Sequence, residues 1–256
     1  MNALEVRGLR KAFGGVLAID DVSFDVPAGT LTALIGPNGA GKSTLFNLMT
    51  NLYQADAGAV TFFGTPLAGK TSDAIARLGL VRTFQTARVF PGMTVLENVL
   101  SGMHMLARSS AWACALALPG AEREERALRA RAEALLDAVG LAALGDRDAM
   151  ALPLGSQKIV ELVRALIARP RLLLLDEPAA GLNDAETAQL ARLLRAIHGS
   201  GSTVFVVEHN MSLVMGIADR VLVLDAGRLI ASGSPPEIQA NHAVIEAYVG
   251  RAAVTP

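Results

Sequence analysis

The sequence of 256 residues contains a single cysteine, Cys114, so an internal disulfide framework is excluded and a reducing compartment is compatible with it. Its formal net charge is −1, which excludes a global electrostatic attraction to nucleic acid. Its longest apolar runs, AWACALAL and LLLL, fall well short of the roughly 20 residues that a membrane-spanning helix needs. The opening MNALEVRGLRKAFGG is too polar for a signal peptide. We therefore expect a soluble intracellular chain, or one held at a membrane by a partner.

Three regions of the chain differ in pattern. Residues 1–85 are rich in strand patterns, residues 86–155 are helical, and residues 156–256 alternate apolar strands with amphipathic helices. Continuous apolar strands with helices between them indicate a parallel sheet buried on both faces. We predict one α/β domain, with a core formed by 1–85 and 156–256, a helical insert at 86–155, and a C-terminal helix and tail at 236–256.

Glycines are concentrated in GPNGAGKS, which fits the phosphate-loop pattern G-x-x-x-x-G-K-[ST]. An apolar run, TLTALIG, precedes the loop and the helix-like TLFNLMTNL follows it, which is the context that this motif requires. Glycines allow backbone N–H groups to converge on a phosphate, a lysine adds charge, and a hydroxyl can join a Mg²⁺ shell. The alternative is a glycine-rich turn that matches by chance. The expected nucleotide-binding residues here are Gly36, Asn38, Gly39, Gly41, Lys42, Ser43 and Thr44.

A phosphate loop needs a carboxylate at a nearby strand end to hold Mg²⁺, and two strand-like runs offer one. VLVLDAG continues into another apolar run, so Asp225 is interpreted as part of a hairpin turn. LLLLDEP instead ends in Asp176 and Glu177, and neighbours on a strand point to opposite faces. We assign Asp176 to Mg²⁺ and Glu177 to the attacking water, against the alternative of a solvated strand end.

The phosphate loop, LLLLDEP and VFVVEH together resemble the ATP-binding subunits of ABC transporters over nearly the whole chain. The resemblance implies a P-loop NTPase core with a RecA-like parallel sheet, an N-terminal antiparallel β-subdomain and an inserted α-helical subdomain. It also implies that Gln85 is the Q-loop residue, which takes part in catalysis and metal binding, and that His209 is the switch histidine. Phe13 corresponds to the aromatic residue that stacks on adenine, and AAGLND to the D-loop.

The family's signature, usually L-S-G-G-Q, is altered in this sequence to LPLGS (residues 152–156), with Ser156 where glutamine is usual. Pro153 replaces a serine and has no N–H to donate, while Leu154 replaces a glycine. Gly155 and the start of the following helix remain, so backbone N–H groups and the helix dipole can still face phosphate. The resemblance therefore implies that Gly155 and Ser156 bind ATP held by a second subunit.

Longer stretches, among them GLVRTFQTARVFPGMTVLENVL and VVEHNMSLVMGIADR, are similar to the Liv-type ATPases of branched-chain amino acid importers. The resemblance implies an ATPase at the cytoplasmic face of the inner membrane, paired with an identical or sibling ATPase, two permease subunits and, indirectly, a solute-binding protein. Urea and short-amide importers have similar ATPases, and spacing and composition do not identify the solute.

Three other classes compete with a transporter ATPase. Soluble ABC ATPases of DNA repair or translation usually carry long coiled-coil inserts or paired cassettes, which this chain lacks. A non-hydrolysing regulatory subunit would be expected to have lost Glu177 or His209. A GTPase is disfavoured because there is no N-K-x-D motif. The apolar segment 102–118 with Trp112 is either a permease-facing surface or core, and Arg88, Phe90 and Glu97 are the residues that the family would use for coupling.

Overall fold

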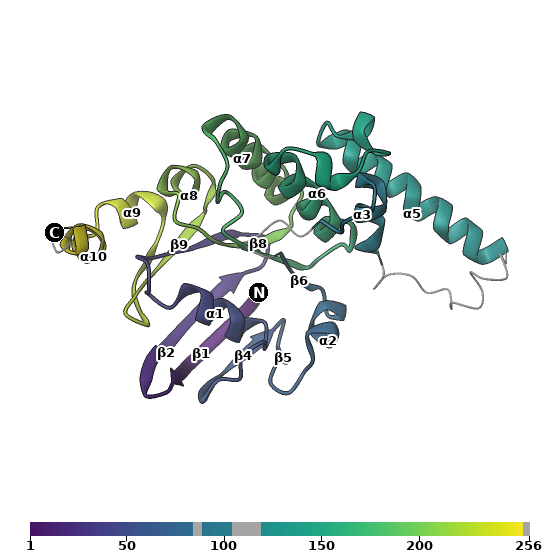
Figure 1. Cartoon of the computed structure of the whole chain (residues 1–256). Helices are drawn as coiled ribbons and strands as arrows, with labels where there is room; N and C mark the ends of the chain where they lie inside the picture. The colour runs from purple at the N-terminus through teal and green to yellow at the C-terminus, as the bar shows by residue number, and fades with distance from the viewer. Residues whose placement is uncertain (84–88, 104–118, 253–256) are drawn as a thin grey trace. The chain divides into compact units, whose positions relative to one another are not determined.

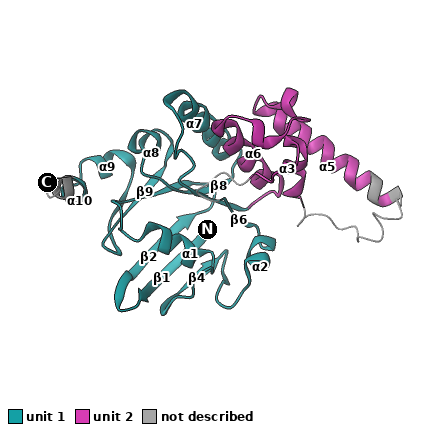
Figure 2. Cartoon of the chain, in the orientation of Figure 1, with its two compact units in different colours: residues 1–85, 171–256 teal, residues 86–170 magenta. Residues whose placement is uncertain are grey.

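A computed structural model describes residues 1–83, 89–103 and 119–252 of the chain (Figure 1). The chain forms two compact units, a core unit of residues 1–85 and 171–256 and a helical unit of residues 86–170 (Figure 2). The predicted end of the insert at residue 155 falls inside a helix, α6 (Leu154–Ile167). Because α6 packs on α3 (Val95–Ser101), it belongs with the helical unit, which extends to Pro170.

The core unit is built on a six-stranded sheet in the order β10-β9-β3-β8-β7-β6. Every neighbouring pair is parallel except β9 and β10, which form the predicted antiparallel hairpin. Three strands are continuous apolar runs whose residues are all buried, as the sequence predicts: β3, β7 and β8. The strands are β3 (Leu31–Ile35), β6 (Leu80–Arg82), β7 (Leu172–Asp176), β8 (Thr203–Val207), β9 (Arg220–Asp225) and β10 (Arg228–Gly233).

Six helices of the core unit are described. They are α1 (Lys42–Met49), α2 (Ser72–Arg77), α7 (Asp184–Gly199), α8 (Met211–Ile217), α9 (Pro235–Gln239) and α10 (His242–Ala252). The single C-terminal helix predicted from residue 236 is thus two helices, α9 and α10. The Asn241 side chain accepts the backbone N–H of Ala243 (2.9 Å) and of Val244 (3.4 Å). An asparagine in this position starts a new helix, because it satisfies amides of the first turn.

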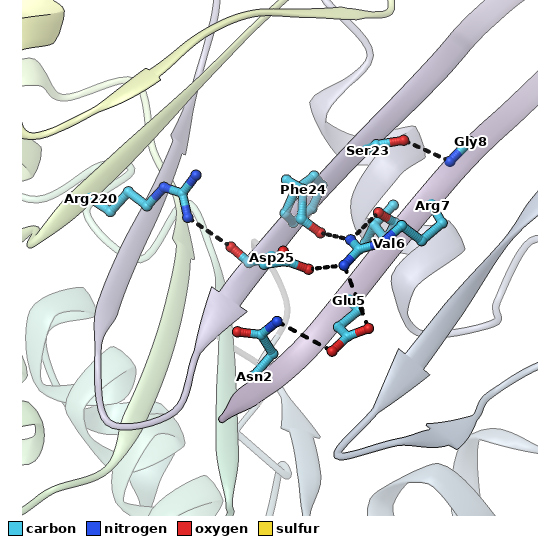
Figure 3. Close-up of polar contacts among 9 residues, drawn as sticks. All are labelled: Asn2, Glu5, Val6, Arg7, Gly8, Ser23, Phe24, Asp25 and Arg220. Atoms are coloured by element: carbon cyan, nitrogen blue, oxygen red, sulfur yellow. Dashed lines mark hydrogen bonds and ion pairs between the residues drawn. The ribbon is translucent and has the colours of Figure 1, made fainter.

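An antiparallel sheet, in the order β2-β1-β4-β5, completes the core unit. Its strands are β1 (Asn2–Phe13), β2 (Val16–Pro27), β4 (Ala57–Phe62) and β5 (Thr65–Pro66). Figure 3 shows how β2 is tied on both sides. Arg7 of β1 pairs with the Asp25 carboxylate, and Arg220 of β9 donates to the Asp25 backbone carbonyl (3.3 Å). The antiparallel sheet is thereby joined to β9 of the six-stranded sheet, the strand next to the outer strand β10.

The helical unit contains α3, α5 (Pro119–Ala138), α6 and the 3₁₀ helices η1 (Ala142–Leu144) and η2 (Ala149–Ala151). Its loop before α3 is held by Asn98, a fully buried side chain that accepts the N–H of Phe90 (2.7 Å) and donates to the Thr94 carbonyl (3.0 Å). Within the described parts of the chain, none of the helices combines the length and apolarity needed to cross a bilayer.

Candidate functional site

A cavity of about 440 Å³ opens in the core unit where the loop after β3 enters α1. It contains most of the residues predicted for a nucleotide: six of the predicted loop residues and Glu177. Its described lining is Val16, Leu17, Ala18, Asn38, Gly39, Ala40, Gly41, Lys42, Ser43, Thr44, Glu177, Ala226 and Gly227. The helix α1 begins at Lys42, so its first-turn N–H groups and the positive end of its dipole lie at this cavity.

Two glycines of the loop are required by close packing within the protein. A Cβ on Gly36 would lie 2.1 Å from the Leu224 carbonyl oxygen of β9, and one on Gly41 would lie 2.6 Å from the Ala18 carbonyl oxygen of β2. Gly39 has open space around it but a φ of +80°, where a side chain is strained. The glycine pattern therefore seats the loop against two neighbouring strands, in addition to leaving its amides accessible.

Lys42 is the cation of the site. Its ammonium group donates to the backbone carbonyls of Gly36 (2.7 Å) and Pro37 (3.0 Å), at the start of the same loop. Burial lowers the pKa of Lys42, while the nearby charges of Glu177 and Asp176 oppose that shift. The lysine is therefore held in the loop beside the two acids that the sequence singled out.

Asp176, the last residue of β7, is buried and faces Arg82 of β6, with 3.4 Å between the Asp176 Oδ2 and Arg82 Nη2 atoms. Burial raises the pKa of Asp176, and the Arg82 charge lowers it by a smaller amount. Arg82 also donates to the side chains of Asn47 (2.7 Å) and Thr50 (3.1 Å). This arginine, which sequence reasoning missed, links α1 to the carboxylate at the end of β7.

Glu177 follows the strand and turns away from it. Its backbone has a φ of +46°, in the region that strains a residue with a side chain. Its N–H donates to the Val207 carbonyl (2.8 Å), and its carbonyl accepts from Ala180 (3.1 Å). The Glu177 Oε2 and His209 Nδ1 atoms are 3.6 Å apart, so the structure brings together the two residues predicted as base and switch.

Phe13 stands outside the described lining of the cavity. Its ring meets Tyr53 edge-on, with 5.4 Å between ring centroids, and Val16, Leu17 and Ala18 form the apolar wall instead. Gly155 and Ser156 lie in the first turn of α6, in the helical unit. Phe90 and Glu97 lie before and within α3 of that unit. Gln85, Arg88 and Trp112 fall outside the described residues.

Two contributions to the site were not foreseen. The turn of the β9–β10 hairpin has positive φ at Ala226 and Gly227, and both residues line the cavity. A two-residue turn of this kind favours glycine, so the hairpin was predictable, but its contact with the loop was not. From α10, Tyr248 lies beside the Gly36 backbone and Asp225; burial raises the pKa of its hydroxyl.

Two family models match the chain. The ABC transporter family model matches residues 19–180, and a second model, branched-chain amino acid ATP-binding cassette transporter, matches residues 228–254. The second match includes all of β10, α9 and α10, with Tyr248.

Curated relatives match over almost their whole length. The high-affinity branched-chain amino acid transport ATP-binding protein LivG of Salmonella typhimurium is 41% identical over 250 residues, which are 97% of this chain and 98% of that protein. BraF of Pseudomonas aeruginosa, described in the same words, is also 41% identical with the same coverage.

Solved structures confirm the predicted fold class. A crystal structure of the ADP conformation of an ABC transporter's ATP-binding cassette matches with a TM-score of 0.84 and 33% identity, over 98% of this chain and 99% of that one. A nucleotide-free cassette matches with a TM-score of 0.83 and 32% identity, over 97% and 99%. From the family match over residues 19–180 and these relatives, we conclude that the chain belongs to the ABC transporter family, as one of its ATP-binding ATPase subunits.

Proposed function

We propose that this chain hydrolyses ATP at the cavity beside α1 to power a membrane importer of branched-chain or other hydrophobic amino acids. The observation that carries the proposal is the convergence of the phosphate loop, Lys42 and Glu177 on one cavity of about 440 Å³. The amino acid specificity is supported by the relatives' descriptions and by the C-terminal family match.

In the proposed site, the loop amides and the start of α1 bind the phosphates, and Lys42 supplies the neutralising charge. The adenine base lies along the apolar wall formed by Val16 and Leu17. Phe13, an exposed residue at the end of the neighbouring strand β1, covers the face of the adenine ring. Moving the ammonium of Lys42 from the loop carbonyls to phosphate oxygens replaces neutral acceptors with charged ones, which are stronger.

Ser43 and Asp176 are the proposed holders of Mg²⁺, together with Gln85. A hydroxyl, a carboxylate and an amide are oxygen donors of the kind that Mg²⁺ prefers, so the residues fit that ion. When bound, Mg²⁺ neutralises charge on the outer phosphates. Asp176 fits this part because its buried carboxylate has a raised pKa, and a nearby cation would relieve its burial.

Glu177 orients the attacking water and takes up its proton, because it is the acid that lines the cavity. His209, whose side chain is more exposed than that of Glu177, lies 3.6 Å from this carboxylate, and its proposed part is to contact the terminal phosphate. The pair thus senses whether a triphosphate is present, and closure brings Gly155 and Ser156 of a second ATPase subunit onto it.

The working assembly that we propose has two ATPase subunits, identical or sibling, beneath two permease subunits at the cytoplasmic face of the plasma membrane. A solute-binding protein delivers the amino acid, and no nucleic acid takes part. Two-fold symmetry gives two equivalent ATP sites, each completed by the first turn of the partner's α6. Phe90 and Glu97 of the helical unit are the proposed contacts to the permease.

The decisive variant is Glu177→Gln, which removes the proton acceptor with almost no change in shape. We expect turnover, measured as phosphate release by the full chain with MgATP, to fall by at least about a hundredfold. The affinity for ATP should stay near that of the wild type, and the nucleotide-bound dimer should accumulate in size-exclusion chromatography, because closure no longer ends in hydrolysis.

Glu186→Gln is the matched control, because Glu186 is a capping carboxylate at the start of α7 in the same unit. It should turn over ATP like the wild type. Unchanged turnover in Glu177→Gln would remove Glu177 from its proposed role. For the solute, hydrolysis by the complex reconstituted with its permeases should rise with leucine, isoleucine or valine; stimulation by urea or short amides alone would contradict the amino acid assignment.

A further inference from the structure

Glu208, the residue between β8 and His209, is a fully buried carboxylate outside the described lining of the cavity. It directly follows the carboxyl end of β8, which pairs in parallel with β7, and it precedes α8. Its backbone N–H continues the parallel sheet by donating to the Leu34 carbonyl (3.2 Å). Its backbone is therefore anchored to the sheet, and the position of its side chain follows from that anchor.

The two carboxylate oxygens of Glu208 accept hydrogen bonds from two separate loops. Oε1 accepts the N–H of Ala179 (2.7 Å), in the turn that follows Glu177. Oε2 accepts the N–H groups of His209 (3.0 Å) and Asn210 (3.2 Å). Among the described residues, Glu208 forms no ion pair with a lysine, arginine or histidine. A carboxylate buried in this way is stabilised by its backbone donors.

These bonds reach both members of the proposed catalytic pair. Ala179 lies two residues after Glu177, whose strained backbone, with a φ of +46°, persists only if its surroundings fix it. The turn is closed by the hydrogen bond from Ala180 to the Glu177 carbonyl (3.1 Å), and the bond from Ala179 to Glu208 fastens it to β8. The second oxygen fastens the backbone that carries His209.

We propose that Glu208 is a positioning residue that sets the separation between Glu177 and His209, by joining the turn after one to the backbone of the other. This inference rests on the proposed function, because it assigns Glu208 a part in the same site. Asn210, the third partner, caps α8 through its side chain, which accepts the N–H of Leu213 (3.0 Å). The Glu208 carboxylate therefore also fixes the start of α8 relative to Glu177.

Glu208→Gln is the test, because glutamine keeps the shape but replaces one acceptor oxygen with an NH₂ group. That group would face N–H donors, so one of the two loops loses its tie. With the full chain and MgATP, we expect kcat to fall about tenfold or more, while KM and the affinity for ATP change by less than about twofold. Nucleotide affinity should hold because the phosphate loop and Lys42 make no hydrogen bond to Glu208 among the described contacts.

Asp219→Asn is the matched control. The Asp219 carboxylate accepts the N–H of Leu31 (2.7 Å) at the beginning of β3, so this variant also removes a carboxylate from a backbone amide of the same sheet. We expect it to leave kcat unchanged and to lower the unfolding temperature by less than Glu208→Gln does, because the Asp219 side chain is 45% exposed and Glu208 is fully buried. A wild-type kcat in Glu208→Gln would overturn the proposal. So would a parallel loss of ATP affinity, because Glu208 would then support the fold as a whole and not the pair of Glu177 and His209.

Hydrogen exchange on the wild-type protein gives a second measurement that does not depend on the variant. The amides of Ala179 and His209 should be protected together, and exchange at the rate of an open loop would overturn the proposal. Glu177→Gln, assayed in parallel, separates the two hypotheses. If it abolishes turnover while Glu208→Gln does not, the proposed function stands and the positioning role fails.

Discussion

Two helices of this chain, α1 in the core unit and α6 in the helical unit, begin in the same unusual way. Within the described structure, neither has a side chain that caps its first turn, and neither has an acidic residue there. By contrast, α2, α3 and α7 each begin with a capping side chain and carry an acid in the first turn. A capping oxygen and a carboxylate would compete with a bound phosphate for the same amides.

What surrounds the two helix starts is different. The start of α1 has a left-handed Gly41 before it, a lysine and two hydroxyl residues in it, and lines a cavity of its own unit. The start of α6 follows Pro153, which offers no N–H, and has Leu154 43% exposed. We interpret the first as a nucleotide site supplied by one chain, and the second as the half that a partner subunit receives.

Lys42→Ala should produce the largest effect, because it removes the positive charge at the start of α1, the helix start that lines the cavity. The loss of a hydrogen bond to a charged group predicts that Kd for a non-hydrolysable ATP analogue rises by roughly one to two orders of magnitude, measured by calorimetry. Lys70→Ala, a lysine of the same unit outside the cavity lining, should leave Kd unchanged. An unaltered Kd in Lys42→Ala would contradict the role of the phosphate loop.

Ser156→Glu should distinguish the role of the start of α6 from that of the start of α1. A carboxylate in the first turn of α6 favours the helix by about 0.3–1 kcal/mol, so the unfolding temperature should stay constant or rise. The affinity of the chain for nucleotide should be unchanged, because Ser156 is outside the cavity lining. Turnover should nevertheless fall about tenfold or more, since a negative charge would approach the partner's triphosphate.

Ser156→Gln is the neutral control and should retain most of the turnover. Equal turnover in Ser156→Glu and the wild type would indicate that α6 does not face phosphate. A weakened Kd in the same variant would indicate that α6 contributes to the nucleotide site of its own chain, and the distinction between a complete and a half site would be wrong.

The sequence predicts the strands of the core unit and the residues at their ends, but not the contacts between distant segments. Continuous apolar runs identify β3, β7 and β8 because their burial on both faces is a local pattern, and the phosphate loop with Asp176 and Glu177 follows from residue types at strand ends. The close packing of Gly36 on Leu224 joins residues far apart in the sequence, so a local reading explains those glycines by phosphate alone.

The boundary of the helical insert was harder to predict, because it too depends on contacts between segments that are distant in the sequence. The amphipathic pattern of α6 gives a helix but not the unit to which its apolar face belongs, and packing on α3 decides that. The role of Glu208 depends on amides from two loops that meet only in the fold, although a carboxylate directly after the apolar run TVFVV was a visible signal. Side chains that act on the backbone of distant segments are the part that composition and spacing leave open.

Asp176→Asn should produce the smallest effect. It measures how much the burial of the Asp176 carboxylate, near the start of α1, lowers the stability of the folded protein. Burial raises the pKa of Asp176, so the unfolded chain loses this proton near pH 4 while the folded protein keeps it to higher pH. Stability is therefore lost as the pH rises through this window. Asparagine removes that loss, and Arg82 keeps its hydrogen bonds to Asn47 and Thr50. The unfolding temperature of the variant without nucleotide should exceed that of the wild type at pH 7, and the two should converge below about pH 4.

Asp56→Asn supplies a control of opposite sign. Hydrogen bonds from Lys11 and from the Ala12 amide lower the pKa of Asp56, so its stabilisation is present above about pH 4 and is lost as the pH falls through the lowered pKa. This variant should unfold below the wild type at pH 7, and its difference should also vanish in acid. If Asp176→Asn instead unfolded below the wild type at pH 7, the pair with Arg82 would outweigh burial, and Asp176 would be a stabilising residue of the core unit as well as a proposed ligand of Mg²⁺.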